Sequence, residues 1–514
     1  MWQRSLALAW VALASGGLTE AGKPPPPPPT SQAIRFNSTF SDNAVLQAEP
    51  SKAAVFGTAG EPIGANGTQK VSVLLSSSSA DVLDIVGSTT VSPSGNWISH
   101  FPPQAAGGEW TVTASCTSGC KNTTAAVLHG LTFGDVWYCA GQSNMWLPMH
   151  FTYSRNYTVA NISAGAYDNI RLMAGDSQHG ATWPWKTARQ AIANSNASAG
   201  QYQLFDFSAA CWYWAETLTT EMKAKGQKPP QIGLISTAIG GSMIEEWLTN
   251  DTISECQNLS IASHNQMLYD SNVRPYLSMS VKGWLWYQGE NDMHGVKGSS
   301  LDHTGYACAQ VALVKLFREK WSAIPGTTAP DAPFGIVAIP PSGTEGGPNL
   351  GAMTVAQTGS YGYLPNAIME NTFIAETYDL NDPWGDKTCY GYGCCNQWEG
   401  PMPNIVPCLA AKCDKYPVSN ASACQKLRCP APFNSTRCET STLQHKLPPM
   451  ACDEYCKVLH GTPVFMCVAP LILLFAPCMT IPLITAITAI TAITAAAAAP
   501  PPRPGVRLLA PEDC

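Results

Sequence analysis

Three short polar turns follow apolar, strand-like runs, and each holds residues that could take part in acyl-transfer chemistry. The first turn follows the run "DVWYCA" and places Ser143 at its tip. The second, "IGGS", supplies Gly240 and Gly241, and the third, "QGEND", supplies Asn291. A serine hydroxyl attacks an ester carbonyl when a base activates it and nearby donors stabilise the oxyanion. The three turns therefore indicate a serine-hydrolase site.

The same turns could also form an oxyanion hole. The backbone N–H groups of Ser143 and Gly241 and the side-chain amide of Asn291 would donate to the developing negative charge. Glycine has no Cβ to block a ligand, so the Gly-Gly pair allows a close approach. Each residue alone also fits an ordinary role as a turn or helix cap. Their joint occurrence at matching strand ends favours the site.

The elements that must position these turns alternate between strand and helix from Phe133 onward. The helical period is clear in "FSAACWYWAETLTTEMKAKG" and "YACAQVALVKLFREKW". Strand-like runs occur in "DVWYCA", "QIGLISTAIGG", "VKGWLWYQGEN" and "FGIVAIP". Such alternation predicts an α/β domain with a mostly parallel sheet. Sites in these sheets form at the carboxyl ends of the strands, where the three turns fall.

The segment before this domain reads differently. Residues 33–131 hold short β-type runs, "KAAVFG", "KVSVLL", "WISHF" and "WTVTASC", separated by Gly, Pro, Asn and Ser clusters. This pattern predicts a small all-β sandwich module. The alternative is a β-extension of the domain that follows.

Composition limits the partners and the compartment. The chain has 514 residues with a net charge of −7, and it lacks a Lys/Arg block. We therefore expect two or three domains and no nucleic-acid partner. Residues 1–22 read as a signal peptide and residues 23–32 as a proline-rich linker, although a short N-terminal helix is the alternative for the first segment.

Cysteines and glycosylation motifs also point to the secretory pathway. The chain has 19 cysteines, ten of them between Cys389 and Cys456. They favour disulfides over a zinc site, because their spacing matches no common ligand pattern, so no metal site is predicted. The chain also holds ten N-x-S/T glycosylation motifs, and together with the cysteines they predict a secreted protein or one of the lysosomal or vacuolar lumen. The motifs are at Asn37, Asn66, Asn122, Asn156, Asn161, Asn196, Asn250, Asn258, Asn420 and Asn434.

The blocks "GDVWYCAGQSNM", "IGLISTAIGGSMIEEW", "VKGWLWYQGEN" and "GAMTVAQT" resemble the sialate O-acetylesterase family of the SGNH/GDSL hydrolases. The resemblance runs from about Phe36 to Asp382. It implies a flavodoxin-like three-layer α/β/α hydrolase domain, residues 132–383, preceded by a β-sandwich. It also implies removal of O-acetyl groups from sugars, typically 9-O-acetyl sialic acids, without a metal or cofactor.

Site residues follow from the resemblance block by block. Ser143 matches the nucleophile, and Gly240 or Gly241 matches the oxyanion glycine. Asn291 matches the amide donor of the superfamily's G-x-N-D pattern, although this family more often has another residue after the glutamate. Three neighbours would support the loop: Gln288, Gly289 and Glu290.

The base is where the chain departs from the family. The family takes its base from an "I-H-P-x-x-K" block near the C-terminus, and no such block is found here. His460, in "KVLHGTPVF", is the remaining candidate, although no proline follows it and no aspartate stands three residues before it. Two other functions stay open: a carbohydrate-binding or cell-surface homologue with impaired catalysis, and an acetylxylan esterase.

The C-terminal region has two parts. Residues 384–466 are Cys-, Pro- and Asn-rich, which predicts a disulfide-stapled insertion. Residues 467–514 form an apolar tail with four Ile-Thr-Ala units from Ile484 to Ala495. We favour a misread coding segment here, because a period of three fits neither a helix face nor a strand. The alternatives are a membrane anchor over residues 467–499, which would bring a membrane partner, and a disordered tail.

Overall fold

The computed structural model describes most of the chain between residues 33 and 377. The expected signal peptide, proline-rich linker, Cys-rich insertion and apolar tail lie outside the described residues, as does His460. The described ranges are 33–63, 68–79, 82–152, 154–175, 183–193, 202–256, 266–294, 305–339 and 350–377.

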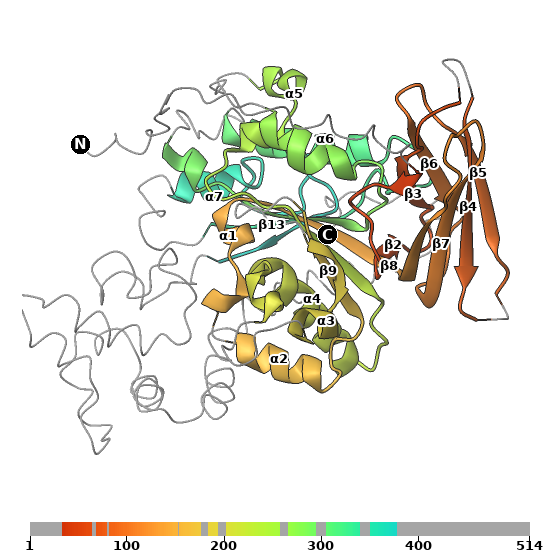
Figure 1. The fold of residues 1–514 in the computed structure, drawn as a ribbon. Helices are drawn as coiled ribbons and strands as arrows, with labels where there is room; N and C mark the ends of the chain where they lie inside the picture. Colours follow the sequence, from red (N-terminus) through yellow and green to blue (C-terminus); the bar gives the residue numbers. More distant parts are fainter. Residues whose placement is uncertain are drawn as a thin grey trace, which may run out of the picture.

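A parallel sheet forms the centre of the larger domain (Figure 1). Its strand order is β9-β11-β8-β12-β13-β14, and β10 pairs antiparallel with β9 at one edge. This order confirms the predicted α/β fold. Strands β9 to β11 lie on one side of β8, and strands β12 to β14 lie on the other. The strands are β8 (Ala126–Gly141), β9 (Ile170–Ala174), β10 (Trp183–Thr187), β11 (Ile232–Ser236), β12 (Gly283–Tyr287), β13 (Phe334–Val337) and β14 (Thr372–Ala375).

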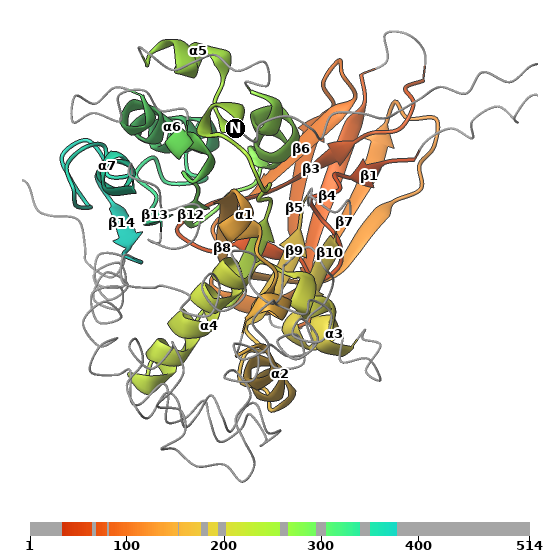
Figure 2. The ribbon, with the colours of Figure 1, turned by 90° about the vertical axis from the view of Figure 1, so that its left-hand side faces the viewer.

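Helices cover both faces of this sheet, which makes three layers (Figures 1 and 2). Aromatic side chains of β12 and α6 pack together on one face, and α4 packs against β8 and β11 on the other. The strands are therefore buried on both sides, which explains why they read as apolar runs rather than as alternating ones. The helices are α1 (Ser143–Trp146), α2 (Arg155–Ser163), α3 (Ala188–Ala193), α4 (Ala209–Ala224), α5 (Asn250–Ser254), α6 (Tyr306–Trp321) and α7 (Leu350–Ala356).

The two helices expected from their period are present. At the start of α4, the Ser208 hydroxyl accepts a hydrogen bond from Cys211 N at 3.2 Å, which satisfies one of the free N–H groups of the first turn. After α4, Gly226 has φ +69°, a conformation that favours glycine and ends the helix. Helix α6 spans the predicted run "YACAQVALVKLFREKW" from its first residue to its last.

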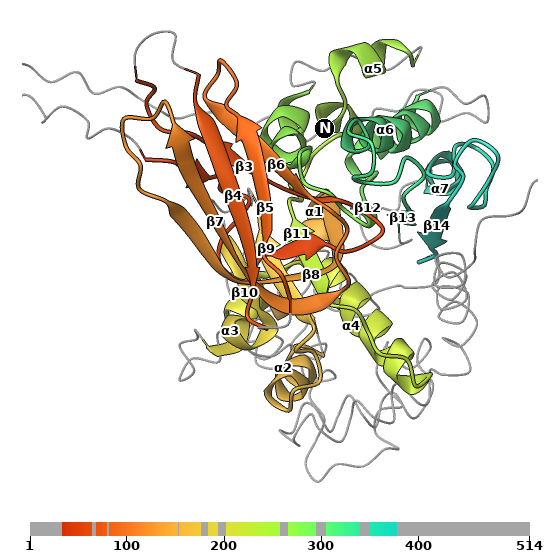
Figure 3. The ribbon, with the colours of Figure 1, turned by 90° about the vertical axis from the view of Figure 1, so that its right-hand side faces the viewer.

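The all-β module consists of two facing sheets (Figure 3). One sheet holds β1, β3 and β6, and the other holds β5, β4, β7 and the first half of β8. Trp97 and Phe101 of β6 share a core with Val73 of β4 and Val112 of β7. The strands are β1 (Arg35–Phe36), β3 (Ala53–Thr58), β4 (Lys70–Ser77), β5 (Ile85–Thr90), β6 (Asn96–Phe101) and β7 (Gly107–Ser118).

One strand belongs to both parts of the molecule. The first half of β8 pairs antiparallel with β7 of the module, and its last five residues pair with β12 of the parallel sheet. Between these stretches, β2 (Val45–Gln47) pairs with residues 132–134 of β8. The boundary expected at residue 131 therefore lies inside a continuous strand.

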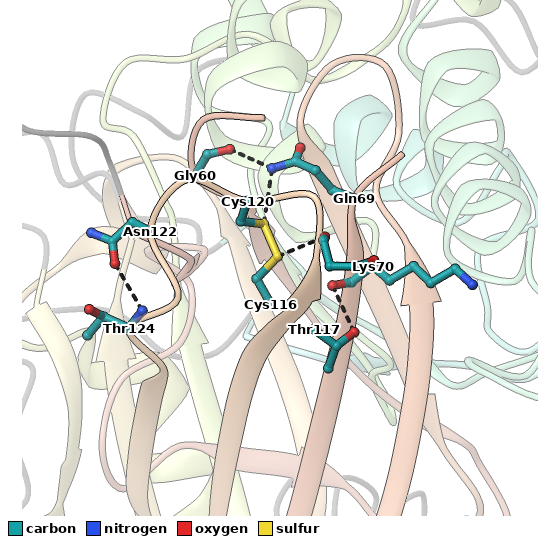
Figure 4. Close-up of a disulfide and its surroundings, with 9 residues drawn as sticks. Gly60, Gln69, Lys70, Cys116, Thr117, Cys120, Asn122 and Thr124 are labelled. Atoms are coloured by element: carbon teal, nitrogen blue, oxygen red, sulfur yellow. Dashed lines mark hydrogen bonds between the residues drawn. A yellow bond between two sulfur atoms is a disulfide. The ribbon is translucent and has the colours of Figure 1, made fainter. Parts of the chain in front are cut away.

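One end of the module is closed by a short disulfide, Cys116–Cys120 (Figure 4). Beside it, Gln69 Nε2 donates to the Gly60 carbonyl at 2.9 Å, which ties β4 to the preceding loop. The glycosylation motif at Asn122 forms a local turn next to the disulfide, with Asn122 Oδ1 accepting a hydrogen bond from Thr124 N at 2.9 Å.

Three disulfides pair all six cysteines of the described ranges. Besides Cys116–Cys120, they are Cys139–Cys211 and Cys256–Cys308. Disulfides persist in oxidising compartments, so these pairs agree with the secretory pathway inferred from the sequence. Cys139–Cys211 joins β8, the strand that leads to Ser143, to the helix α4 that covers it.

We expect the double variant Cys139→Ala/Cys211→Ala to lose about 4 kcal/mol of unfolding free energy. The bond closes a loop with a sequence separation of 72, and removing it restores the entropy of that loop to the unfolded chain. Cys116→Ala/Cys120→Ala, with a separation of 4, is the matched control and should lose about 2 kcal/mol. Urea unfolding measures both values, and an equal loss in the two variants would contradict the loop argument.

Candidate active site

The three polar turns meet at one edge of the parallel sheet. Strand β8 lies between β11 and β12, so the turns that follow these three strands are neighbours. Beyond the strand ends, Ile239 N donates to the Gly141 carbonyl at 3.0 Å. On the other side, Gln142 N donates to the Tyr287 carbonyl at 2.9 Å. The structure therefore brings together the chain segments that carry Ser143, the Gly-Gly pair and Asn291.

Ser143 is the first residue of α1 and follows a sharp turn at the end of β8. Gly141 allows this turn, because its φ is +139° and a Cβ there would lie 2.1 Å from the Tyr287 carbonyl oxygen. The Ser143 side chain is half-buried. Within the described residues its hydroxyl has no hydrogen-bond partner, which leaves it available to a base or a substrate.

Gln142, immediately before Ser143, joins the first turn to the third through its side chain. Its side chain is buried, and its Oε1 accepts hydrogen bonds from Gly289 N at 3.1 Å and Asn291 N at 3.3 Å. On the other side of Ser143, Asn144 Nδ2 donates to Glu290 Oε1. The residues that flank the serine therefore fix its position relative to the third turn.

The second turn is open to solvent and is held by the third. Gly241 is exposed and has φ +75°, and no atom lies within 4 Å of the place where a Cβ would stand. Asn291 Nδ2 donates to the Gly241 carbonyl at 2.5 Å, and Gln288 Nε2 donates to the Ser242 carbonyl at 3.0 Å. Asn291 thus contacts the Gly-Gly turn directly.

Gln288 connects the third turn to the core behind it. The Tyr306 hydroxyl of α6 donates to Gln288 Oε1 at 2.8 Å, and Gln357 Nε2 donates to the Gln288 carbonyl at 3.1 Å. Gly289 follows with φ +141°, where a Cβ would lie 2.5 Å from Ile339 Cδ1. These contacts hold the third turn against the core, and the supporting role of Gln288 and Gly289 stays a prediction.

Two buried acids behind the turns were not singled out by the sequence analysis. Asp292 and Glu245 have relative exposures of only 4% and 6%. Asp292 Oδ2 accepts hydrogen bonds from Ile244 N at 3.2 Å and from Gln288 Nε2. Burial raises the pKa of Asp292 well above its usual range, and the neighbouring Glu245 carboxyl raises it further.

The predicted donor role of Asn291 implies that Asn291→Ala lowers kcat for ester hydrolysis by about 100-fold, because the loss of one oxyanion donor typically costs this much or more. The change also removes the contact with Gly241. Asn96→Ala, the same change at an exposed position of β6, is the control and should keep the wild-type rate. Steady-state kinetics on 4-nitrophenyl acetate measures both rates, and a wild-type kcat in Asn291→Ala would exclude the donor role.

None of the histidines whose side chains the structure describes lies in the three turns. His100 and His129 lie on strands of the β-module. His150 lies in the 3-10 helix Met149–Phe151, with Nδ1 at 3.2 Å from the Phe205 carbonyl, and burial lowers its pKa. The assignment of His460 therefore stays a prediction.

The described part of the chain shows neither a metal-binding cluster nor a membrane-spanning helix. It contains no group of three or more His, Cys, Asp or Glu side chains arranged to hold a metal ion. Nor does any of its helices have the length and apolar character needed to cross a membrane. The tail considered as an anchor, residues 467–499, lies outside this part.

A three-layer α/β domain with a serine turn, a Gly-Gly turn and an amide-bearing turn at adjacent strand ends defines a hydrolase of the α/β class. Within that class, residues 133–325 match the model of a family of carbohydrate esterases, described as sialic acid-specific acetylesterases.

Several known proteins are similar to this chain. The sialate O-acetylesterase of Homo sapiens is 28% identical over 427 residues, which cover 74% of this chain and 75% of that protein. The Mus musculus sialate O-acetylesterase is 26% identical over 440 residues, covering 74% and 77%. Among solved structures, a carbohydrate acetylesterase from Xanthomonas citri shares the fold, with a TM-score of 0.50, 20% identity and coverage of 69% of this chain and 70% of that one.

Proposed function

We propose that this protein removes O-acetyl groups from sialic acids or related acetylated sugars through an acyl-enzyme on Ser143. The observation that carries the proposal is the meeting of the three turns at the ends of β11, β8 and β12. Similarity to sialate O-acetylesterases supports the substrate class.

The proposed reaction has two halves. Ser143 Oγ attacks the acetyl carbonyl carbon while a base, for which His460 is the candidate, accepts the hydroxyl proton. The N–H groups of Ser143 and Gly241 and the Asn291 amide stabilise the oxyanion. Cleavage of the ester bond releases the sugar hydroxyl, which takes up the proton, and leaves acetyl-Ser143. Water then hydrolyses this ester, and acetate leaves.

The surroundings of Ser143 fit this chemistry. Gly241 leaves space beside the serine turn for an acetyl group, because nothing lies within 4 Å of its missing Cβ. Gln142 Oε1 accepts hydrogen bonds from Gly289 N and Asn291 N, and Asn291 Nδ2 donates one to the Gly241 carbonyl, so the three turns are held together before a substrate binds. Such preorganisation reduces the reorganisation that the transition state would otherwise require.

The proposed location is the lumen of the secretory pathway or the exterior of the cell. The three disulfides support it, because such bonds form in oxidising compartments. The glycosylation motifs are consistent with it.

Acetate release by the full-length chain tests the function. We expect release from 9-O-acetylated sialic acid at a higher kcat/KM than from acetylated xylan, with Ser143→Ala as the negative control. The reverse order would assign the protein as an acetylxylan esterase. Binding of the acetylated sugar without release of acetate, measured by calorimetry, would indicate a carbohydrate-binding protein and overturn the proposal.

A further inference from the structure

We propose that Tyr138, Thr237 and Asn272 form a closed hydrogen-bond ring that positions the second turn of the active site. Tyr138 lies on β8, the strand that leads to the first turn, and Thr237 follows β11, four residues before Gly241. Asn272 lies in the short π-helix Tyr269–Val273. The inference rests on the proposed function for its kinetic consequence, whereas the ring and its effect on the turn do not depend on that function.

Each member of the ring donates to the next. The Thr237 hydroxyl donates to the Tyr138 hydroxyl at 2.7 Å, and the Tyr138 hydroxyl donates to the Asn272 carbonyl at 2.5 Å. Asn272 Nδ2 donates to the Thr237 carbonyl at 2.7 Å, which closes the ring. Burial raises the pKa of Tyr138 well above its usual range, so this hydroxyl keeps its proton and remains a donor.

The ring lies in the core of the domain. Tyr138 and Thr237 are fully buried, and Asn272 has a relative exposure of only 1%. The rings of Tyr276 and Trp321 pack against Tyr138, with centroid distances of 5.6 and 5.3 Å. In such surroundings water does not readily replace a lost partner, so a buried polar group without one is costly. A ring in which every member is bonded to the next is correspondingly rigid.

Three atoms of Thr237 are held, which determines where the second turn begins. Its Oγ1 and its carbonyl oxygen belong to the ring, and its N donates to the Cys139 carbonyl at 3.0 Å. Two residues later, Ile239 N donates to the Gly141 carbonyl at 3.0 Å. These bonds continue the pairing of β11 with β8 beyond the last strand residue, up to the Gly-Gly pair that contains Gly241.

The second turn needs such support because glycine restricts the backbone least. Gly241 is exposed, and Asn291 of the third turn holds its carbonyl from one side. The ring holds the same segment from the core. An oxyanion donor is effective when its N–H already points to the place where the charge develops. Tyr138 and Thr237 are therefore positioning residues, which act through the N–H of Gly241.

Tyr138→Phe and Thr237→Val test the inference in the full-length protein, because each removes one hydroxyl of the ring and nearly preserves the shape of the side chain. We expect each variant to lower kcat on 4-nitrophenyl acetate by about tenfold. KM should stay unchanged, because the oxyanion donor acts on the transition state. A wild-type kcat together with a lower Tm would leave the ring a structural role alone and overturn the inference.

Tyr167→Phe is the matched control. Tyr167 is also buried, and its hydroxyl lies 3.3 Å from Thr220 Oγ1. It precedes β9, so it lies at the opposite edge of the parallel sheet from the three turns. This variant should keep the wild-type kcat, and a tenfold loss here as well would show that removing any buried tyrosine hydroxyl has the same effect, which would overturn the inference.

The double variant Tyr138→Phe/Thr237→Val shows whether the two hydroxyls act through one another. In a ring, the first substitution already breaks the bond that the second would remove, so the double variant should lose about tenfold, as Tyr138→Phe does alone. Losses that multiply to about 100-fold would mean that the hydroxyls act independently, and would overturn the ring.

Hydrogen exchange of the backbone amides gives a readout that needs no esterase activity. Residues 238–242 should exchange faster in Tyr138→Phe than in the wild type, and should keep the wild-type rate in Tyr167→Phe. Unchanged exchange of this segment in Tyr138→Phe would overturn the inference even if the esterase is active. Faster exchange in a protein that releases no acetate would support the ring and overturn the proposed function alone.

Discussion

Replacing Ser143 with alanine is expected to lower kcat for acetyl ester hydrolysis by at least about 10⁴-fold, because the acyl-enzyme can no longer form. Folding should be unaffected. The hydroxyl has no hydrogen-bond partner among the described residues, and a half-buried serine at a helix start tolerates alanine within about 0.5 kcal/mol. Acetate release and thermal unfolding of the purified variant measure the two effects separately.

Two further variants complete this experiment. Ser254→Ala, at the exposed end of α5, controls for the serine-to-alanine change and should keep the wild-type rate. His460→Ala tests the proposed base, and we expect it to approach the rate of Ser143→Ala, because a nucleophile and its base act as a unit. Full activity in His460→Ala would exclude that histidine, whereas full activity in Ser143→Ala would overturn the proposed mechanism.

Gly141→Ala is expected to damage both the stability and the active site. The added methyl group would lie 2.1 Å from the Tyr287 carbonyl oxygen, and the backbone at φ +139° is strained for any residue with a Cβ. A backbone oxygen cannot rotate away, so β8 and β12 must separate where they pair through Gly141 and Tyr287. We expect a loss of about 3 kcal/mol or more in unfolding free energy.

The same separation should break the hydrogen bond from Gln142 N to the Tyr287 carbonyl, and with it the alignment of the serine with the third turn. Acetate release by the folded fraction of Gly141→Ala should therefore fall as well. Gly351→Ala is the matched control, because no atom lies within 4 Å of the new Cβ and alanine favours the helix α7. Urea unfolding compares the two, and equal stabilities would show that the contact at Gly141 relaxes without cost.

The convergence of the three turns could be predicted from the sequence, because the carboxyl ends of parallel strands share one edge of a sheet. The apolar runs before Ser143, Ile239 and Gln288 were sufficient to place the strands. The fold class followed from the alternation of such runs with the helical periods of α4 and α6. These patterns are local, so they can be recognised in the sequence without knowledge of contacts between distant residues.

The contacts that hold the turns together could not be predicted. Gln142 and Asn144 read as ordinary polar turn residues, and only the structure shows them bonded to the third turn. Acidic residues such as Glu245 and Asp292 are normally exposed, so their burial is a property of the tertiary packing. The partner of Cys139 likewise depends on how α4 folds back over the sheet.

Strand β8 makes the β-module and the catalytic domain inseparable. A recombination event or proteolytic cut at residue 131, where the composition changes, would sever the backbone that ends at Ser143 and would strip β2 from its partner. The β-module therefore cannot be removed or replaced without disrupting a strand of the parallel sheet. A substitution that shifts the register of β7 on β8 would therefore displace the far end of the same strand, which leads to Ser143.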